Sequence, residues 1–224
     1  MSAGPVTAPI NTLIVRVAVQ ERYSDASFEA LGGCDKATGR WWRWELTADV
    51  KARLSNKGLS RRRGAAHSSV DINLLELVAM VVTAVVMVQG NKPVFIADPV
   101  LLRCDNSSCV AWGSSAGGVR DPRGAGLMRA YGALEAGCDW SFKAKHIKGV
   151  DNVLADTVSR VALTDVQAAL VRLCPSPASP WKQATLPPLA LELTLAATWQ
   201  PELWGPQLWR SMRELGSSGS PTAL

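Results

Sequence analysis

The stretch ALGGCDKATGRWWRWEL, residues 30–46, predicts two strands joined by a tight turn. Its middle, DKATG, consists of residue types that favour turns. The segment that follows alternates, with Trp and Leu side chains separated by Arg43 and Glu45, which is the period of a strand with one buried face. We therefore predict an antiparallel hairpin over these residues.

The sequence around this hairpin predicts a mixed sheet. A β-branched run, Leu13–Val19, predicts a strand that reaches towards Asp25 and completes a three-stranded antiparallel meander. The chain that follows predicts a helix, a strand, two helices, a strand and a helix. Their ranges are Ile72–Val88, Val100–Cys104, Ser107–Ser114, Gly126–Ala136, Trp140–Ile147 and Val153–Ala162. This order predicts an α/β fold, a five-stranded mixed sheet with two parallel strands beside the meander and helices on its faces.

The ends of the chain differ in character from its middle. We expect residues 1–12 to be an N-terminal extension and residues 13–163 to be the folded domain. Residues 164–224 are expected to form a C-terminal helix and a tail rich in Pro and Trp that is partly disordered, not a second domain. Residues 51–63 hold six basic residues and no acid, which predicts an exposed loop.

Composition indicates an intracellular protein, cytoplasmic or nuclear. The five cysteines are odd in number and form no C-x-x-C pair, as expected of reduced thiols. The N-terminus lacks a secretory signal. The longest apolar stretch, Leu74–Val88, contains Glu76 and is shorter than the ~20 residues of a membrane span, so we expect a buried helix and no membrane partner. The net charge of +5 suits a polyanionic partner, although it would also serve solubility.

Four acids occupy positions at which predicted strands and helices would bring them together. Asp25 lies near the end of the first strand, Asp105 follows the fourth, Glu76 lies in an apolar helix and Asp156 lies in the last helix of the domain. Clustered carboxylates repel one another, and a divalent cation such as Mg²⁺ relieves that repulsion. Two such ions can clamp a scissile phosphate. Taken singly, an Asp after a strand is more often a turn or cap residue, whereas a charge inside an apolar helix needs a partner.

One histidine has a comparable context. His146 precedes a Gly-containing turn and lies ten residues before Asp156. It could carry protons during a reaction or have a purely structural hydrogen bond.

Four motifs, in order, resemble those of the ribonuclease H domains of retrotransposons, which accompany a reverse transcriptase. They are SDAS with LGG (residues 24–27 and 31–33), INLLELVA (72–79), CDNS (104–107) and HIKGVDNVLADTVSR (146–160). The resemblance implies a ribonuclease H-like fold and a nuclease that cuts the RNA strand of RNA–DNA hybrids. It implies that Asp25, Glu76, Asp105 and Asp156 bind two Mg²⁺ ions, or Mn²⁺, with His146 as an auxiliary residue. A reverse transcriptase domain of the same element is the protein partner it implies.

A hybrid substrate would be held mainly through its phosphates. The candidate nucleic-acid contacts are Arg61, Arg62, Arg63, Asn106, Arg120, Arg123, Arg129, Lys143, Lys145 and Lys148. A run of basic residues is more often only a solvated face.

Three other functions are compatible with these features. The first is an inactive retroelement relic that binds nucleic acid or protein. The second is a strand-transfer enzyme of the same fold, although such enzymes place the glutamate last of three acids, and here Glu76 comes second. The third is a protein-interaction module that uses the tryptophans of the tail, Trp199, Trp204 and Trp209.

Overall fold

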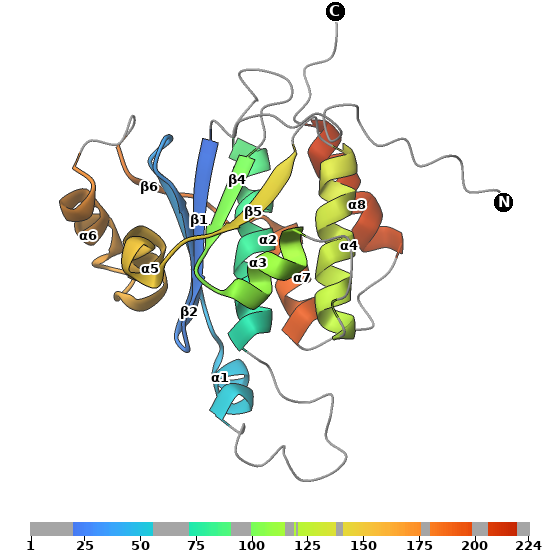
Figure 1. The fold of residues 1–224 in the computed structure, drawn as a ribbon, viewed down its shortest axis with the longest axis horizontal. Coiled ribbons are helices and arrows are strands. Elements are labelled where there is room, and N and C mark those ends of the chain that lie inside the picture. The colour runs from blue at the N-terminus through green and yellow to red at the C-terminus, as the bar shows by residue number, and fades with distance from the viewer. Residues whose placement is uncertain are drawn as a thin grey trace, which may run out of the picture.

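A single six-stranded sheet organises the protein (Figure 1). The computed structural model describes residues 20–55, 72–90, 100–114, 119, 121–137, 141–175, 180–198 and 206–218. The strands are β1 (Gln20–Ala26), β2 (Ala30–Asp35), β3 (Arg40–Glu45), β4 (Val100–Cys104), β5 (Phe142–His146) and β6 (Lys182–Gln183). Their spatial order is β5-β4-β1-β2-β3-β6. The strands β1, β2 and β3 pair antiparallel, as predicted, and β4 and β5 extend the sheet in parallel from β1.

The prediction of five strands was wrong by one. The sixth strand, β6, spans only Lys182–Gln183 and pairs in parallel with β3 at Arg40 and Trp41. Two residues cannot show an alternating pattern, so the sequence gives no signal for such a strand. The predicted segment Leu13–Val19 lies outside the described residues, and β1 begins at Gln20.

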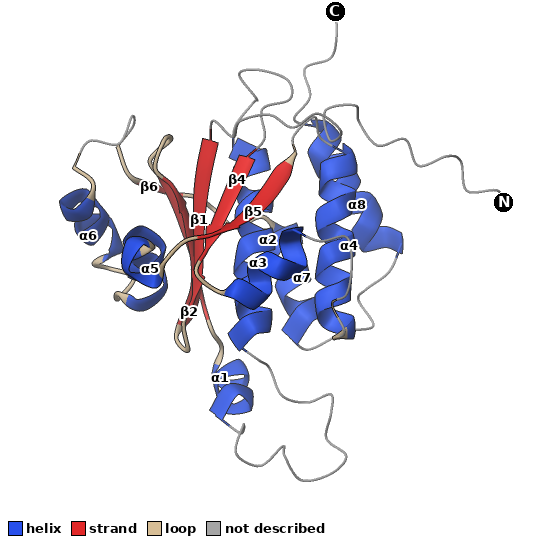
Figure 2. Ribbon diagram, viewed as in Figure 1, coloured by secondary structure: helices blue, strands red, loops and turns tan. Residues whose placement is uncertain are grey.

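Helices cover both faces of the sheet (Figure 2). The helices are α1 (Ala48–Ser55), α2 (Ile72–Gly90), α3 (Ser107–Ser114), α4 (Pro122–Gly137), α5 (Val153–Arg160), α6 (Val166–Leu173), α7 (Pro188–Thr198) and α8 (Pro206–Ser218), with a 3₁₀ turn, η3 (Gly149–Asp151), before α5. One face carries α5, which contacts β1, β2 and β3, and α6 packs on α5. The other face carries α2. The helices α4 and α7 pack against α2, and α8 packs mainly against α4.

Two adjacent glycines of β2, Gly32 and Gly33, let a helix approach each face of the sheet closely at the same point along the strand. A Cβ on Gly32 would lie 2.7 Å from Val158 Cγ1 of α5. A Cβ on Gly33 would lie 2.3 Å from Thr83 Oγ1 of α2. Successive residues of a strand face opposite sides, so this pair opens space for both helices. In the antiparallel register Gly32 pairs with Asp25, so the close packing occurs beside the predicted site.

The charged residues at the start of β1, Glu21 and Arg22, form ion pairs within the sheet. Arg22 is 1% exposed and forms an ion pair with Asp35, at 2.9 Å between Nη1 and Oδ1. Glu21 pairs with Arg103 of β4. Buried charges are tolerated when paired in this way.

The helix α2 forms the centre of the core. Apart from Glu76 and Thr83, its buried side chains are apolar. Thr83 Oγ1 accepts a hydrogen bond from Trp42 Nε1 at 3.1 Å and donates one to the carbonyl of Ala79. No helix among the described residues has the length and apolar character that crossing a membrane requires.

The region after residue 163 is more ordered than expected. We predicted one helix and a tail, but the structure also has β6, α7 and α8, and the last two helices bury Leu193 and Met212 in the main core. Residues 51–55 belong to α1 and not to the predicted loop, whereas residues 56–63 lie outside the described part. The sequence did not predict α7 and α8, and both helices pack against α2 and α4.

Candidate metal centre

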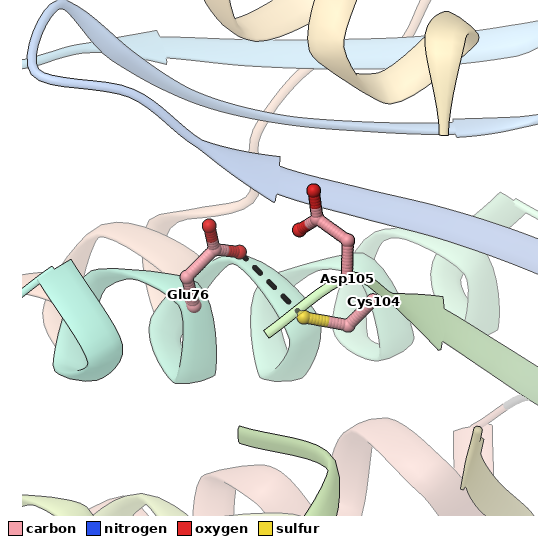
Figure 3. A group of neighbouring side chains, drawn as sticks. All are labelled: Glu76, Cys104 and Asp105. Atoms are coloured by element: carbon pink, nitrogen blue, oxygen red, sulfur yellow. Dashed lines mark hydrogen bonds between the residues drawn. The ribbon is translucent and has the colours of Figure 1, made fainter. Parts of the chain in front are cut away.

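The sheet topology brings three of the predicted acids together at the carboxyl ends of two inner strands. The strands β1 and β4 are parallel neighbours, so Asp25 near the end of β1 and Asp105 just after β4 lie side by side. The helix α2 packs on both strands and carries Glu76 to this place. Figure 3 shows Glu76 on α2 and the side chains of Cys104 and Asp105 gathered beside it at the end of β4.

Glu76 is a buried acid. Its side chain is 5% exposed, and Cys104 Sγ donates to its Oε2 at 3.6 Å. Burial, followed by the charges of Cys104, Asp25 and Asp105, raises the pKa of Glu76 to about 10. No ion pair joins Glu76 to a Lys or Arg in the part of the chain that the structure describes. In the absence of a cation, Glu76 is therefore protonated at neutral pH.

Asp25 is also buried, at 2% exposure. Burial, together with the charges of Asp105 and Asp156, raises the pKa of Asp25 to about 6. The hydrogen bond that Ser159 Oγ donates to Oδ2 and the charge of Arg160 oppose this increase. The three aspartates are thus close enough to act on one another electrostatically.

The helix α5 is fixed to the sheet at both ends. Before its first turn, Asn152 Nδ2 donates to the carbonyl of Ser24 at 3.1 Å. At its last turn, Ser27 Oγ donates to the carbonyl of Ser159 at 2.8 Å, and Arg43 Nη1 donates to that of Val158 at 2.5 Å. The last two bonds satisfy carbonyls that the end of a helix leaves open. They also fix the positions of Asp156 and Ser159 relative to β1.

Asp156 lies at the outer side of the cluster. Its side chain is 46% exposed and forms an ion pair with Arg160 one turn later. Among the described residues, the group whose possible ligand atoms all lie within 4.8 Å of one another consists of Glu76, Cys104 and Asp105. The structure therefore brings Glu76 and Asp105 together directly. Asp25 lies outside this tight group and acts on Glu76 through its charge, and the charge of Asp156 acts on Asp25.

His146 lies beside Asp105 and is exposed. Its Nε2 is 3.1 Å from the backbone carbonyl of Asp105. A carbonyl only accepts hydrogen bonds, so this contact requires a proton on Nε2 and leaves Nδ1 as the acceptor of the ring. The sequence-based expectation that His146 belongs to this region agrees with its position, and its role stays a prediction.

The side chain of Asn106, a predicted nucleic-acid contact, forms hydrogen bonds within the protein. Its Oδ1 accepts from the N–H of Cys109, which caps α3, and its Nδ2 donates to Asn73 Oδ1 at 2.8 Å. Both ends of the amide are thereby used inside the protein.

The structure describes only some of the basic residues that were predicted to contact nucleic acid. Arg61, Arg62, Arg63 and Arg120 lie outside the described residues. Arg123 forms an ion pair with Asp121, at 2.7 Å between Nη2 and Oδ2. Lys145 and Lys148 are exposed, on β5 and directly after it, next to His146.

Two residues of the site were not predicted. The sequence predicts Cys104 only as one of five reduced thiols, and Ser159 lies in the motif of residues 146–160 with no role of its own. A signal for Ser159 was present, because residues three apart on a helix share a face, so Ser159 accompanies Asp156. Cys104 had no comparable signal, since a buried thiol is common in any core.

The donor set fits a divalent cation. Glu76 and Asp25 are buried carboxylates that repel one another, and Glu76 has no Lys or Arg partner in the described part of the chain; a divalent cation stabilises such an arrangement. The protein is thus a mixed α/β protein with a six-stranded sheet and a Glu–Cys–Asp group that could hold a metal ion. No family model matches the chain, and neither a curated protein nor a solved structure matches it.

Proposed function

We propose that this protein is a ribonuclease H that hydrolyses the RNA strand of RNA–DNA hybrids with divalent metal ions. The proposal rests on the position of Asp25, Glu76 and Asp105 at the carboxyl ends of β1 and β4. Glu76 is buried there, and no Lys or Arg among the described residues pairs with it. The resemblance of four ordered motifs to retroelement ribonuclease H domains supports the same reading. An antiparallel meander extended by two parallel strands is the sheet that a ribonuclease H-like fold would need.

Each residue would have a distinct part in holding the metal ions. Glu76 and Asp105 would supply the inner ligands, Asp25 would add a ligand from β1, and the half-exposed Asp156 would close the site on the solvent side. Bound Mg²⁺ or Mn²⁺ would supply activation of the attacking water and neutralisation of the leaving oxygen. Asp156 is paired with Arg160, an exposed pair that costs little to separate.

Ser159 and His146 would support the acids. Ser159 Oγ donates to Asp25 and thereby favours its ionised form, which is the form that binds a cation. His146 keeps a proton on Nε2 through the carbonyl of Asp105, so Nδ1 is the atom that could accept a proton from water or return one to the product.

The substrate class follows from charge and from the resemblance. Lys145 and Lys148 lie exposed beside His146 and could contact phosphates of the hybrid. Recognition of the RNA strand would rest on its 2′-hydroxyl groups, without sequence specificity. A reverse transcriptase domain of the same element would add binding surface.

A cleavage assay tests this proposal. The full chain would be incubated with Mg²⁺, or Mn²⁺, and a hybrid labelled on either strand, beside Glu76→Gln and the control Glu135→Gln. Glu135 is a second partly buried acid, whose pKa burial raises to about 7, but it lies in α4 and its Oε1 accepts from the N–H of Phe142. A glutamine can keep that bond, so the control tests for a general effect of removing a buried charge.

We expect metal-dependent cleavage of the RNA strand by the parent and by Glu135→Gln, and none by Glu76→Gln. Equal cleavage by both variants would contradict the proposed site. Hybrid binding without cleavage by the parent, in either metal, would instead favour the non-catalytic nucleic-acid-binding protein.

A further inference from the structure

The thiol of Cys104 is a metal ligand of a different chemical class from its neighbours. Its side chain is completely buried at the end of β4, and its Sγ belongs to the tight group with Glu76 and Asp105 (Figure 3). Mg²⁺ prefers oxygen ligands and gains nothing from a sulfur. Thiolate is a ligand that selects Zn²⁺ and other soft cations.

The spacing of the donor atoms fits such a cation. Cys104 Sγ and Glu76 Oε2 are 3.6 Å apart. A tetrahedral zinc ion with its usual bond lengths to sulfur and oxygen separates those two ligands by about 3.6 Å. Adjacent oxygen ligands of an octahedral Mg²⁺ are only about 2.9 Å apart. The pair is thus already spaced for zinc without rearrangement.

Two further contacts favour a cation here. The Glu76 carboxylate is buried and aimed at this sulfur, and no Lys or Arg among the described residues pairs with it. The backbone N–H of Asn106 donates to Cys104 Sγ at 3.4 Å, a hydrogen bond that the sulfur can accept as a thiol or as a thiolate and so can keep when a cation binds. A cation that displaced the thiol and carboxyl protons would be held by the sulfur and the carboxylate together.

We propose that Glu76, Cys104 and Asp105 form a binding site for a thiophilic divalent cation of the zinc class, which excludes Mg²⁺ and inhibits the protein. On binding, Cys104 and the protonated Glu76 each release a proton to solvent, and the thiolate and the two carboxylates supply three ligands. Water completes the tetrahedron. The inhibition rests on the proposed nuclease function, whereas the binding does not.

Cadmium is the probe for the binding. The full chain, kept reduced with a phosphine, is titrated with Cd²⁺ while the ultraviolet thiolate-to-metal absorption is recorded. The variants are Cys104→Ser and the control Cys174→Ser, a buried thiol that belongs to the separate cluster beneath α6. We expect the absorption in the parent and the control, and its loss in Cys104→Ser with at least about tenfold weaker affinity. Equal absorption in both variants overturns the proposal.

A measurement on the parent alone removes any dependence on whether a variant folds. The ¹¹³Cd resonance of the loaded protein separates sulfur-containing from all-oxygen coordination, and an all-oxygen shift overturns the proposal. In hybrid cleavage with Mg²⁺, we expect added Zn²⁺ to inhibit the parent more strongly than Cys104→Ser. Equal inhibition overturns the regulatory role. An inactive parent that still shows the Cys104-dependent absorption keeps the binding site and rejects only the nuclease.

Discussion

At the scale of single residues, Glu76 links stability to function. Its carboxylate is buried among other acids and is protonated in the metal-free protein at neutral pH. The same burial that makes it costly as a lone anion makes it an effective cation ligand, because the cation removes the repulsion.

The raised pKa of Glu76 predicts how stability depends on pH. The folded pKa, about 10, lies above the ordinary value of 4.5, so between these values the folded state binds a proton that the unfolded state has lost. The contribution of Glu76 to the free energy of unfolding is therefore largest below about pH 4.5 and falls as pH rises towards 10. Urea unfolding with a chelator should show this decline, and Glu76→Gln should flatten it. Identical slopes in parent and variant would contradict the burial of this acid.

Ser159 provides a second prediction at this scale. Replacing it by Ala removes the hydrogen bond to Asp25 that lowers the Asp25 pKa, so that pKa should rise above about 6. Hydrogen bonds to charged groups predict a rise of roughly one unit. Carboxyl-carbon NMR titration of the metal-free protein measures it, with Ser114→Ala, exposed and bonded to the carbonyl of Ala144, as control. An unchanged Asp25 titration in Ser159→Ala would show that the bond has no such effect.

The sequence predicted the acids better than their neighbours. Glu76 stood out because a charge in an apolar helix needs a reason, and Asp105 because it follows a buried strand. The contacts of Cys104 with Glu76 of α2 and of Asn106 with Cys109 of α3 were not predictable from the sequence. Nothing local in the sequence records such contacts.

At the scale of elements, the glycine pair in β2 sets the distance between the sheet and its two helices. Gly32→Ala would place a Cβ 2.7 Å from Val158 Cγ1 and 3.1 Å from the N of Ser159, and α5 would have to move away from Asp25. We expect a loss of stability of about 1–3 kcal/mol and weaker metal binding.

The matched control for this change is Gly132→Ala in α4. A Cβ at Gly132 meets nothing within 4 Å, and Ala favours a helix over Gly by about 1 kcal/mol, so this variant should be as stable as the parent or more so. Chemical denaturation of both variants measures the contrast. A Gly32→Ala protein as stable as the parent would mean that α5 does not need this close approach.

Elements with a strong periodic pattern were predictable, and those defined by pairing were not. The alternation in β3 predicts Trp42 and Arg43 on opposite faces, and in the structure Trp42 bonds to Thr83 of α2 whereas Arg43 bonds to Val158 of α5. The helix α2 was recognised by its apolar length. By contrast, β6 has two residues, and it exists because it pairs with Arg40 and Trp41 at the edge of β3.

At the scale of the whole molecule, the C-terminal helices complete the core. Leu193 of α7 is fully buried, whereas Leu195 in the same helix is 39% exposed. Leu193→Ala should therefore lower the free energy of unfolding by about 2–5 kcal/mol. Leu195→Ala should change it by only about 0.5 kcal/mol. Urea midpoints compare the two, and equal effects would show that α7 is not part of the core.

The sequence could not reveal this role of residues 188–218. Their prolines and short apolar runs resemble a linker when read locally, and their helices gain stability mainly by packing on α2 and α4. The first five strands and the four candidate acids, in contrast, were predicted from patterns within residues 13–160.

A calorimetric titration with Mn²⁺ tests most directly whether the acids form one metal centre. The chelator-treated parent would be compared with Asp25→Asn, Glu76→Gln, Asp105→Asn and Asp156→Asn, and with the control Glu135→Gln. We predict saturable binding by the parent and the control, and clearly weaker binding by each of the other four variants. Binding of unchanged strength in all four would contradict a shared metal site at the ends of β1 and β4.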